Sequence, residues 1–404
     1  MRIALITGYY PPPYNANAVR AMYMARELAR SGFEVYVVPL LGTKSSSGFF
    51  GERIVSLSRS VAGSGSFYRK PSLARRIIDV LSSRRVAEEV ITALRDASPE
   101  IVIATLPPVE AIPLGYEIAK RFRARFVADI QDLADEYRVL SRPWLAPAIR
   151  AYFRRVYGAV ARADLVSVTT EFMQRVLAEK HGVRAPMIVV PNGVDNEFYS
   201  KCFEKRVRGS SREAVFLGDL NFAYHKLDVF IEALKLAAEE GLDLRLRVVG
   251  EGSELPKLRE LAERLGVMDR VEFRGHVPRE ALVEELSCGA FGLAGRPAID
   301  NLWIVTTMRM TVYEYLSCGL PVLAYGPPNS YTQHFVESNG VGIYVPSNDP
   351  RHLLDGAKRL LKIVESEGEE ISRRCREVAL RYEWSSVMRV LARRCLELLE
   401  RGSG

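Results

Sequence analysis

Two charged side chains stand where a nucleotide could be held. Lys226 lies in a loop between a predicted strand, residues 214–217, and the next helix, and its ammonium group could bind a phosphate as a point charge. Glu314 lies in a short helix that leads into a buried strand, where its carboxylate could accept hydrogen bonds from ribose hydroxyls. The alternatives are a solvated lysine near a helix start and a surface glutamate on an amphipathic helix.

Two glycine-containing turns follow predicted strands. Gly250-Glu251-Gly252 is half of a dinucleotide-binding fingerprint or an ordinary tight turn between a strand and a helix. Pro191-Asn192-Gly193 ends a predicted strand near the middle of the chain, where two halves of similar pattern meet. The sequence contains no Gly-Lys-Ser/Thr phosphate loop, no complete Gly-x-Gly-x-x-Gly and no His-Glu-x-x-His, and its histidines are dispersed. We therefore expect no metal site.

The elements that must position these residues alternate between strands and helices in both halves. The clearest unit is strand 3–7, helix 18–30 and strand 35–38. Further strands are predicted at residues 101–104, 126–130, 187–190, 214–217, 244–249, 271–273, 322–324 and 343–345. The pattern predicts the α/β class, with two doubly wound, Rossmann-like lobes of parallel strands.

Length and composition agree with a two-domain globular protein. The chain has 404 residues, which is more than one hydrophobic core usually supports, and 48% of them are apolar. The apolar stretch at the start is too short for a signal peptide, and no apolar run is long enough to span a membrane. Five scattered cysteines fit neither a disulfide framework nor a zinc site. We expect a cytoplasmic protein.

Much of the net charge of +7 lies in two segments that are poor in acids. Residues 67–86 contain six basic side chains and only Asp79, and residues 137–162 contain six arginines and no acid. Such segments favour an anionic partner. The aromatic residues among the arginines favour a membrane surface over nucleic acid, because regularly spaced stacking aromatics are absent. Alternatively, the apolar stripes pack on the core and the arginines are solvated.

The order of short motifs along nearly the whole chain resembles the family 4 glycosyltransferases, which are retaining enzymes of GT-B fold. The matching pieces are residues 10–12, 25–35, 104–108, 129–133, 191–195, 249–255, 271–278 and 314–322. The closest likeness is to transferases that build surface polysaccharides and glycolipids from membrane-borne acceptors. The resemblance implies two lobes that face each other across a cleft.

The resemblance also implies roles for individual residues. Asp132 would face the sugar and the acceptor, Lys226 would bind the donor diphosphate, and Glu314 would bind the ribose. The backbone at Gly275 and Val277 would contact the nucleobase. The remaining implied donor-binding positions are Asn17, Arg20, Gly250, Gly252, Thr306 and Arg309. For Asp132 a helix N-cap is an equal alternative.

Three positions depart from the family pattern. Asn15-Ala16-Asn17 replaces a glycine pair in the first loop, Asp219 stands where an arginine is expected beside the diphosphate, and Thr306 replaces a glutamate that contacts the transferred sugar. Arg296 or Arg309 could supply the missing positive charge. The departure at Thr306 leaves the donor sugar open.

The sequence therefore predicts a glycosyltransferase that moves a sugar, with retention and without a metal or other cofactor, from a UDP- or GDP-linked donor to a glycan or lipid-linked acceptor. The predicted acceptor lobe spans residues 1–195 and is completed by residues 385–404; the donor lobe spans residues 196–384. We expect a peripheral protein at the inner face of an anionic membrane and no nucleic-acid partner. The alternatives are a non-catalytic GT-B protein that binds a nucleotide sugar or glycan, and a nucleic-acid-binding protein.

Overall fold

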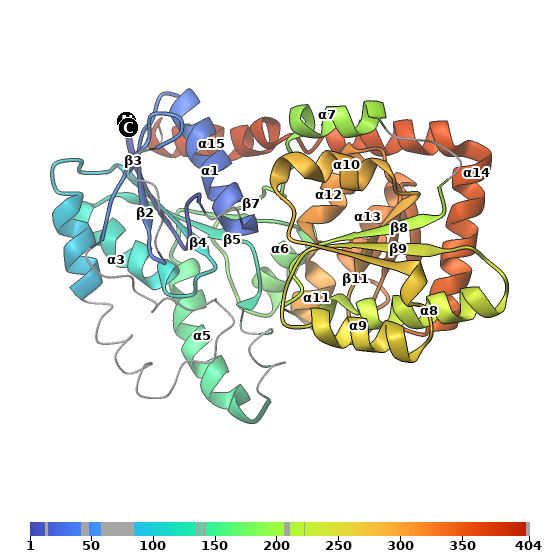
Figure 1. Cartoon of the computed structure of the whole chain (residues 1–404). Helices are drawn as coiled ribbons and strands as arrows, with labels where there is room; N and C mark the ends of the chain where they lie inside the picture. Colours follow the sequence, from blue (N-terminus) through green and yellow to red (C-terminus); the bar gives the residue numbers. More distant parts are fainter. Residues whose placement is uncertain are drawn as a thin grey trace. The chain divides into compact units, whose positions relative to one another are not determined.

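The computed structural model describes residues 1–12, 15–41, 48–57, 85–134, 136, 139, 143–205, 211–221 and 223–400. The chain divides into two compact units, which we describe separately (Figure 1). Unit 1 consists of Met1–Asn192 and Trp384–Gly404, and unit 2 consists of Gly193–Glu383. The sequence analysis placed the first boundary after residue 195 and the second after residue 384.

The described residues of unit 1 form a seven-stranded parallel sheet in the order β3-β2-β1-β4-β5-β6-β7. Its strands are β1 (Arg2–Thr7), β2 (Glu34–Pro39), β3 (Arg53–Ile54), β4 (Ile101–Leu106), β5 (Arg125–Ile130), β6 (Leu165–Val168) and β7 (Met187–Val189). Its helices include α1 (Ala16–Arg30), α3 (Ala111–Phe122), α5 (Ala146–Val160), α6 (Glu171–Glu179) and α15 (Trp384–Glu400), with a 3-10 turn η1 (Pro143–Leu145).

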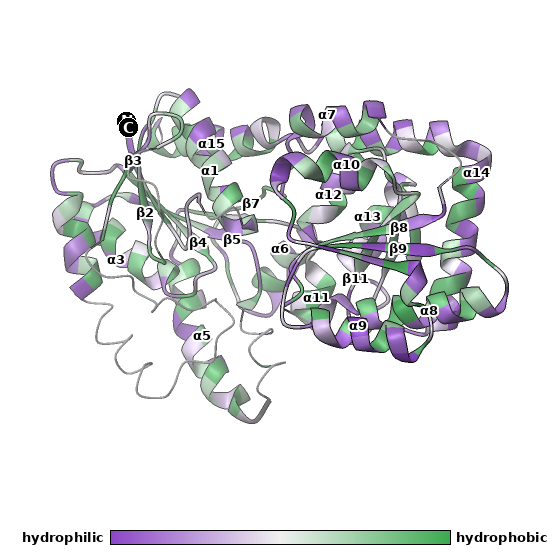
Figure 2. Ribbon diagram, viewed as in Figure 1, coloured by the Kyte–Doolittle hydropathy of each residue, from purple (hydrophilic) through white to green (hydrophobic). Residues whose placement is uncertain are grey.

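The central strands of unit 1 are buried because helices cover both faces of a doubly wound sheet. Every residue of β4 is buried, and β1 is buried from its second residue onward. The same strands are coloured hydrophobic in Figure 2. Helix α1 begins after Asn15, whose side-chain oxygen accepts from the backbone N–H of Ala18 over 2.9 Å and so caps the helix.

The last helix of the chain, α15, belongs to unit 1 and packs on α1. The ring of Trp384, the first residue of α15, stacks on Tyr23 of α1 with 5.2 Å between centroids and 9° between planes. Trp384 is almost fully buried. The chain therefore returns to the first unit after building the second.

The described residues of unit 2 form a six-stranded parallel sheet in the order β10-β9-β8-β11-β12-β13. The strands are β8 (Glu213–Leu217), β9 (Arg245–Val249), β10 (Val271–Gly275), β11 (Phe291–Gly295), β12 (Val322–Tyr325) and β13 (Gly342–Val345). The helices are α7 (Asn196–Lys205), α8 (Leu227–Glu239), α9 (Leu255–Arg264), α10 (Leu282–Ser287), α11 (Leu302–Thr306), α12 (Met310–Ser317), α13 (Tyr331–Asn339) and α14 (Pro350–Leu380), with 3-10 turns η2 (Ala223–His225), η3 (Met268–Arg270) and η4 (Arg279–Ala281).

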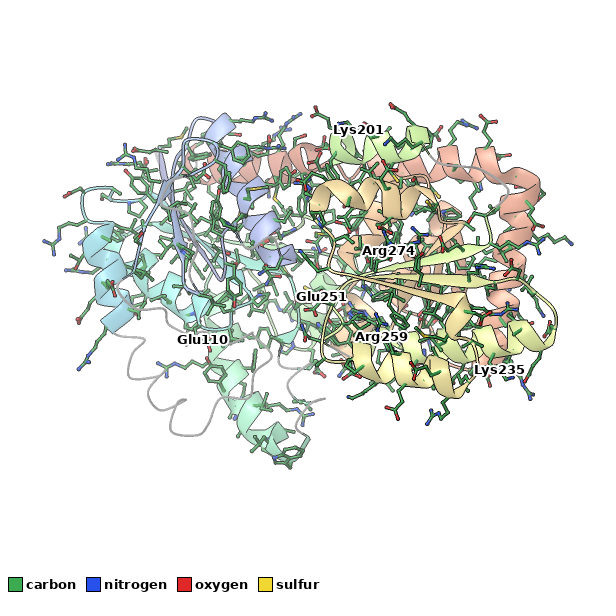
Figure 3. All side chains as sticks on the ribbon, in the orientation of Figure 1. Glu110, Lys201, Lys235, Glu251, Arg259 and Arg274 are labelled. Atoms are coloured by element: carbon green, nitrogen blue, oxygen red, sulfur yellow. The ribbon has the colours of Figure 1, made fainter. Side chains whose placement is uncertain are left out.

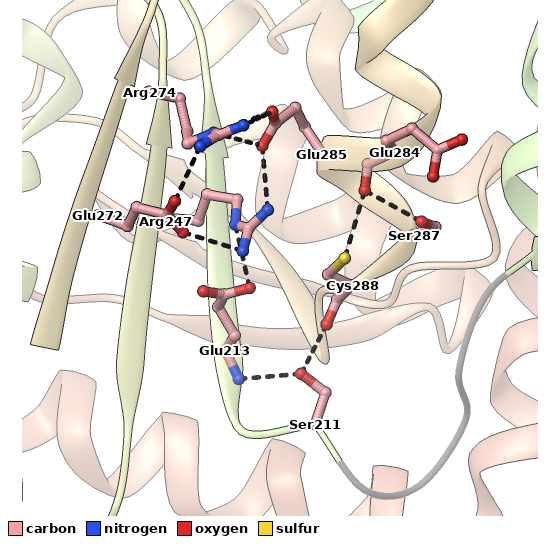
Figure 4. A network of polar contacts seen from close by, with 9 residues as sticks. All are labelled: Ser211, Glu213, Arg247, Glu272, Arg274, Glu284, Glu285, Ser287 and Cys288. Atoms are coloured by element: carbon pink, nitrogen blue, oxygen red, sulfur yellow. Dashed lines mark hydrogen bonds and ion pairs between the residues drawn. The ribbon is translucent and has the colours of Figure 1, made fainter.

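An ion-pair network fastens α10 to three strands of unit 2 (Figure 4). Arg247 of β9 contacts Glu213, Glu272 and Glu285 within 3.1 Å, and Arg274 of β10 contacts Glu272 and Glu285 within 3.0 Å. Glu285 of α10 is only 4% exposed, so both of its oxygens need these partners. The network is structural, because each cation in it faces a carboxylate.

The predicted α/β class and the two doubly wound sheets are confirmed, and the predicted strands match within a few residues at each end. Strands β3, β6 and β11 were not predicted. Of the basic segment 67–86, only residues 85 and 86 are described, and they lie in a helix that runs from residue 85 to residue 93. The basic segment 137–162 is described at residue 139 and at residues 143–162, which include α5. Within the described residues, no helix combines the length and the apolar character needed to cross a membrane.

Candidate functional site

The sheet of unit 2 reverses its strand order between β8 and β11. The chain leaves β8 to build β9 and β10 on one side, and then places β11 on the other side. Loops at the carboxyl ends of two such strands diverge, and this is the usual ligand position in doubly wound folds. In unit 2 the two loops are residues 218–221 and 223–226 after β8 and the segment that begins with Arg296 after β11.

Arg309 and His225 are hydrogen-bonded to each other at this position. Nη1 of Arg309 lies 2.6 Å from Nδ1 of His225, and Nη2 donates to the carbonyl oxygen of Leu217 over 2.9 Å. Nε2 of His225 lies 2.8 Å from the carbonyl oxygen of Asp219, so Nε2 carries the proton and Nδ1 accepts. Burial, together with the charges of Arg309 and Arg296, holds the pKa of His225 well below 6.5, and the imidazole is neutral.

Arg296 lies against two aromatic rings at the same position. Its guanidinium carbon is 5.1 Å from the ring centroid of Tyr224 and 4.9 Å from that of Trp303. Its Nε and Nη1 atoms are buried, and within the described part of the chain neither has a hydrogen-bond partner. Burial lowers the pKa of Arg309, and the charge of Arg296 lowers it further. Two like charges therefore lie close enough to repel each other.

The cations at this position outnumber the carboxylates paired with them. Lys226 donates to Asp228 over 2.7 Å, and its backbone adopts a positive φ of 51° immediately before α8. Arg296 and Arg309 form no ion pair with any carboxylate in the described residues. A net positive charge beside the reversal of strand order suits an anionic ligand.

Glu314 of α12 lies next to Tyr199 of α7. The hydroxyl of Tyr199, a residue only 3% exposed, donates a hydrogen bond to the carboxylate of Glu314. Burial raises the pKa of Glu314, and this effect outweighs the opposing effects of that hydrogen bond and of the Arg279 and Arg309 charges. Arg279 is itself paired with Asp195 over 2.7 Å. Tyr199 therefore orients the carboxylate of Glu314 in unit 2.

Gly250 and Gly252 let two loops of unit 2 approach each other. A Cβ atom on Gly250 would lie 1.9 Å from the carbonyl oxygen of Gly218, and one on Gly252 would lie 2.1 Å from the carbonyl carbon of Leu220. Between them, Glu251 stands at the carboxyl end of β9 (Figure 3), and its carbonyl oxygen accepts from Leu220 N–H over 2.9 Å. Loop packing therefore accounts for both glycines, and a contact with the donor stays a prediction.

The other predicted donor-binding positions of unit 2 lie around the same edge of the sheet. Gly275 ends β10 with a φ of +67°, and Val277 follows it and is half-buried. Thr306 ends α11, is 1% exposed, and donates from its hydroxyl to the carbonyl oxygen of Leu302 over 2.6 Å. Of these three, Thr306 is committed to its own helix.

Arg20 requires a correction. Its side chain is fully buried in unit 1, and its nitrogens donate to both oxygens of Asp129, at 3.0 and 2.7 Å. They also donate to the carbonyl oxygens of Val190 and Pro191, each over 2.9 Å, and to Oδ1 of Asn192. All five N–H groups of the guanidinium are thus used within the protein. The donor-binding role predicted for Arg20 is wrong in physical terms, because the side chain has no donor left for a ligand.

Asp132 and Asn17 are the remaining predicted residues of unit 1. Asp132 lies two residues after β5 and is half-buried. Asn17 lies in the first turn of α1 and is also half-buried. The described residues contain no cluster of three or more His, Cys, Asp or Glu side chains suited to a metal ion. The roles of Asp132 and Asn17 stay predictions.

Comparison with known proteins identifies the family. Residues 18–198 match the profile described as Glycosyltransferase Family 4, and residues 211–362 match the profile described as Glycosyl transferases group 1. Together the two matches cover most of the chain. The chain belongs to the family 4 glycosyltransferases. The resemblance predicted from the sequence is therefore confirmed.

Solved structures show that this glycosyltransferase has the GT-B fold. Sucrose-phosphate synthase (tll1590) from Thermosynechococcus elongatus is 15% identical with a TM-score of 0.74, over 99% of this chain and 100% of that one. WaaG, a glycosyltransferase involved in lipopolysaccharide biosynthesis, is 16% identical with a TM-score of 0.64, over 96% and 98%. A trehalose-6-phosphate protein from E. coli, bound with UDP-2-fluoro glucose, is 11% identical with a TM-score of 0.68, over 98% and 99%. Identities this low establish the fold alone.

One curated relative matches part of the glycosyltransferase. Exopolysaccharide phosphotransferase SCO2592 from Streptomyces coelicolor is 26% identical over 200 residues, which are 49% of this chain. The match covers only 20% of that protein. This chain therefore spans a small part of the length of that relative, and the activity in its name belongs to the relative.

Sequence reasoning missed the side chains that hold the charged residues of this glycosyltransferase. Tyr224 and His225 directly precede Lys226, so an aromatic pair beside a predicted phosphate ligand was a usable signal. Trp303 and Tyr199 gave no such signal, because only the fold brings them to Arg296 and Glu314.

Proposed function

We propose that this glycosyltransferase takes its sugar from a nucleotide diphosphate donor bound by unit 2. The proposal is carried by the positive charge of Lys226, Arg296 and Arg309 where β8 and β11 diverge, because two of these cations have no carboxylate partner among the residues that the structure describes. A diphosphate supplies the missing negative charge, and the carboxylate of Glu314 accepts from the ribose hydroxyls. The backbone near Gly275 contacts the base of a UDP- or GDP-linked donor.

Transfer then depends on stabilising the leaving diphosphate. As the bond between the sugar C1 and the diphosphate oxygen breaks, negative charge grows on that oxygen, and Lys226 and Arg309 stabilise it. The N-terminus of α8, which directly follows Lys226, adds backbone N–H groups and a favourable dipole. We propose that the sugar is transferred with retention and without a metal ion.

The acceptor in this proposal binds to unit 1 near Asp132 and is a glycan or a lipid-linked glycan. Two relatives support this class of acceptor: WaaG is named for lipopolysaccharide biosynthesis, and the Streptomyces coelicolor relative is named for exopolysaccharide. Thr306, whose hydroxyl is committed to Leu302, leaves the transferred sugar open.

The first test is binding and single turnover with the whole chain. Calorimetry with UDP and GDP should show that one of them binds, and radiolabelled donors of the same base should then lose their sugar to an acceptor or to water. If neither nucleotide binds at millimolar concentration, the proposed function is wrong. Binding without any transfer or hydrolysis favours the alternative of a non-catalytic GT-B protein that binds nucleotide sugars.

We further propose that unit 1 binds an anionic membrane surface through α5. Arg150, Arg154 and Arg155 are exposed on this helix, and none of them pairs with a carboxylate in the described residues. Trp144, just before the helix, is 73% exposed, and Tyr152 is 37% exposed. Exposed cations beside exposed aromatic rings are the composition of a membrane-surface helix.

Liposome co-sedimentation tests this surface. The three α5 arginines are replaced together by glutamine, and the matched control replaces exposed Arg351, Arg373 and Arg393 instead. Each basic residue near an anionic leaflet contributes about 1 kcal/mol, so the α5 variant should lose most binding at low salt while the control keeps it. Equal binding to neutral and anionic vesicles, or equal loss in both variants, would overturn the proposal.

A further inference from the structure

Arg296 is a half-buried cation whose inner nitrogens find no acceptor in the described part of the protein. Two of its three guanidinium nitrogens, Nε and Nη1, are buried without a partner. Its backbone is fixed, because its N–H donates to the carbonyl oxygen of Tyr325 and its own carbonyl oxygen accepts from Asn348, both over 2.9 Å. A charged group left in this state costs free energy of folding, so its retention calls for a role other than stability.

Two aromatic rings hold the guanidinium of Arg296 in place. The rings of Tyr224 and Trp303 are 5.3 Å apart and almost perpendicular, at 88°, and the guanidinium carbon lies about as far from each centroid. Their faces attract the cation but offer no hydrogen-bond acceptor. Arginine held in this way is oriented without its N–H groups being used.

The neighbours of Arg296 offer no negative charge either. His225 is neutral, its only acceptor nitrogen is already taken by Arg309, and Arg309 is itself a cation. Lys226, which directly follows His225 in the sequence, is paired with Asp228. The described protein therefore offers Arg296 neither an acceptor nor a negative charge, an arrangement that suits an anion supplied from outside.

We propose that Arg296 binds an oxyanion of the donor, with Tyr224 and Trp303 as the rings that orient it. This rests on the proposed function, in which the donor is a nucleotide diphosphate sugar at the carboxyl ends of β8 and β11. The oxyanion belongs either to the diphosphate or to a carboxylate on the transferred sugar. Arg296 carries at this place the charge that Asp219 does not supply.

Calorimetry with a ladder of ligands tests the proposal. Uridine, UMP, UDP, UDP-glucose and UDP-glucuronate, or the guanosine series if GDP is the nucleotide that binds, are titrated into the wild type, R296Q and R296K. The control is R373Q, because Arg373 is an exposed arginine of the same unit. We expect R296Q to bind the ligand with the matching oxyanion at least about tenfold more weakly, R296K to lie between, and R373Q to match the wild type.

The arms of this experiment identify the oxyanion. Weaker binding of UDP, UDP-glucose and UDP-glucuronate alike assigns Arg296 to the diphosphate. Weaker binding of UDP-glucuronate alone assigns it to a sugar carboxylate. Equal affinities of R296Q and wild type for every ligand overturn the proposal, whereas a wild type that binds no member of either series overturns the proposed function instead.

Thermal unfolding without ligand separates this role from a structural one. R296Q should melt at the same temperature as the wild type or higher, because it removes an unsatisfied buried charge. The rise in melting temperature caused by UDP or GDP should be smaller in R296Q. A lower melting temperature without ligand, together with an unchanged ligand-induced rise, would show that Arg296 only stabilises the fold.

The fluorescence of Trp303 provides a local readout of nucleotide binding beside Arg296. A version in which Trp144 and Trp384 are replaced by phenylalanine leaves Trp303 as the single emitter, since the chain has three tryptophans. Nucleotide binding should change its emission because the guanidinium lies 4.9 Å from its ring. The change should disappear when R296Q is added to this version, and an unchanged response would contradict the proposal.

Discussion

Arg20 in unit 1 and Arg296 in unit 2 both place guanidinium nitrogens in the protein interior, but the hydrogen-bond partners of those nitrogens differ completely. Arg20 is 0% exposed and donates to Asp129, to two carbonyl oxygens and to Asn192. Arg296 places two nitrogens in the interior and, within the described residues, gives them no acceptor. The guanidinium of Arg20 is part of the structure of unit 1, whereas that of Arg296 keeps N–H groups that a ligand could bind. Hydrogen-bond accounting separates the two roles where residue type and burial do not.

The network of Figure 4 shows that unit 2 can pair its arginines when stability requires it. Arg247 and Arg274 share Glu285 and Glu272 at distances of 2.8 to 3.1 Å. The shortage of acceptors at Arg296 is therefore local. It occurs at the carboxyl end of β11, beside the reversal of strand order, where ligands usually bind and where an arginine without internal acceptors can bind an anion.

We expect the largest effect from replacing Arg20, the arginine whose N–H groups all have hydrogen-bond partners. R20M leaves the carboxylate of Asp129 buried without its cation, and we expect a loss of about 3–5 kcal/mol in the free energy of unfolding. Denaturant titration followed by circular dichroism measures it. Adding D129N should recover part of the loss, because the uncompensated charge is then removed. An R20M protein as stable as the wild type would mean that the ion pair of Arg20 with Asp129 does not stabilise unit 1.

Replacing Glu314 tests the predicted contact between unit 2 and the ribose of the donor. E314A removes the acceptor of the ribose hydroxyls, and a charge-assisted hydrogen bond contributes about 1.5–3 kcal/mol, so UDP or GDP should bind at least about tenfold more weakly. Calorimetry on the folded variant measures this, with E337A as a control from the exposed face of α13. Unchanged affinity in E314A would show that the ribose is bound elsewhere.

The ion network should give a smaller effect, and only on stability. E285Q removes the carboxylate shared by Arg247 and Arg274, and Arg247 keeps Glu213 and Glu272 as partners. We expect a loss of about 1 kcal/mol in the free energy of unfolding. Nucleotide affinity should not change. A drop in affinity in a stable E285Q protein would mean that paired and unpaired arginines are not functionally separate.

The smallest effect should be a dependence of stability on pH that comes from His225. Its pKa is lowered in the folded protein, so below about pH 6.5 the unfolded chain binds a proton that the folded chain does not. Stability of unit 2 should therefore fall as the pH drops below that value. H225Q keeps one acceptor for Arg309 and one donor for Asp219 but does not titrate. Melting temperatures at pH 5.5 and 7.5 should differ less in H225Q than in the wild type.

Most of the fold could be predicted because the central strands of both sheets are buried on two faces. Continuous apolar runs such as residues 101–104 and 322–324 are visible in the sequence, and glycines or prolines end them. Strand β11 was missed although it is buried, because two of its five residues are glycines, which are rare inside strands. Strand β6 was missed because it is four residues long and contains Ser167, whose hydroxyl donates to Asp129 in the core. A polar residue with a buried partner looks like a loop residue until the partner is known.

The site could be predicted only in part. Lys226, Glu314 and Arg309 were named because the order of motifs pointed to them, and their roles stay predictions. The contact of Arg296 with Tyr224 and Trp303 depends on β8 and β11 being neighbours in the sheet, although β9 and β10 separate them in the sequence. Arg20 was assigned wrongly for the same reason, because its partners Asp129, Val190 and Pro191 are distant in the sequence.

The return of α15 to unit 1 has a consequence for the order in which the protein matures during synthesis. The ribosome makes residues 1–192 before unit 2, but the helix that covers α1 and the ring that stacks on Tyr23 are made only after unit 2. Unit 2 has all of its elements before α15 has left the ribosome, whereas the apolar face of α1 stays uncovered until α15 has been made. A nascent chain stopped before Trp384 should therefore carry a protease-resistant unit 2 and a unit 1 that chaperones and proteases still recognise.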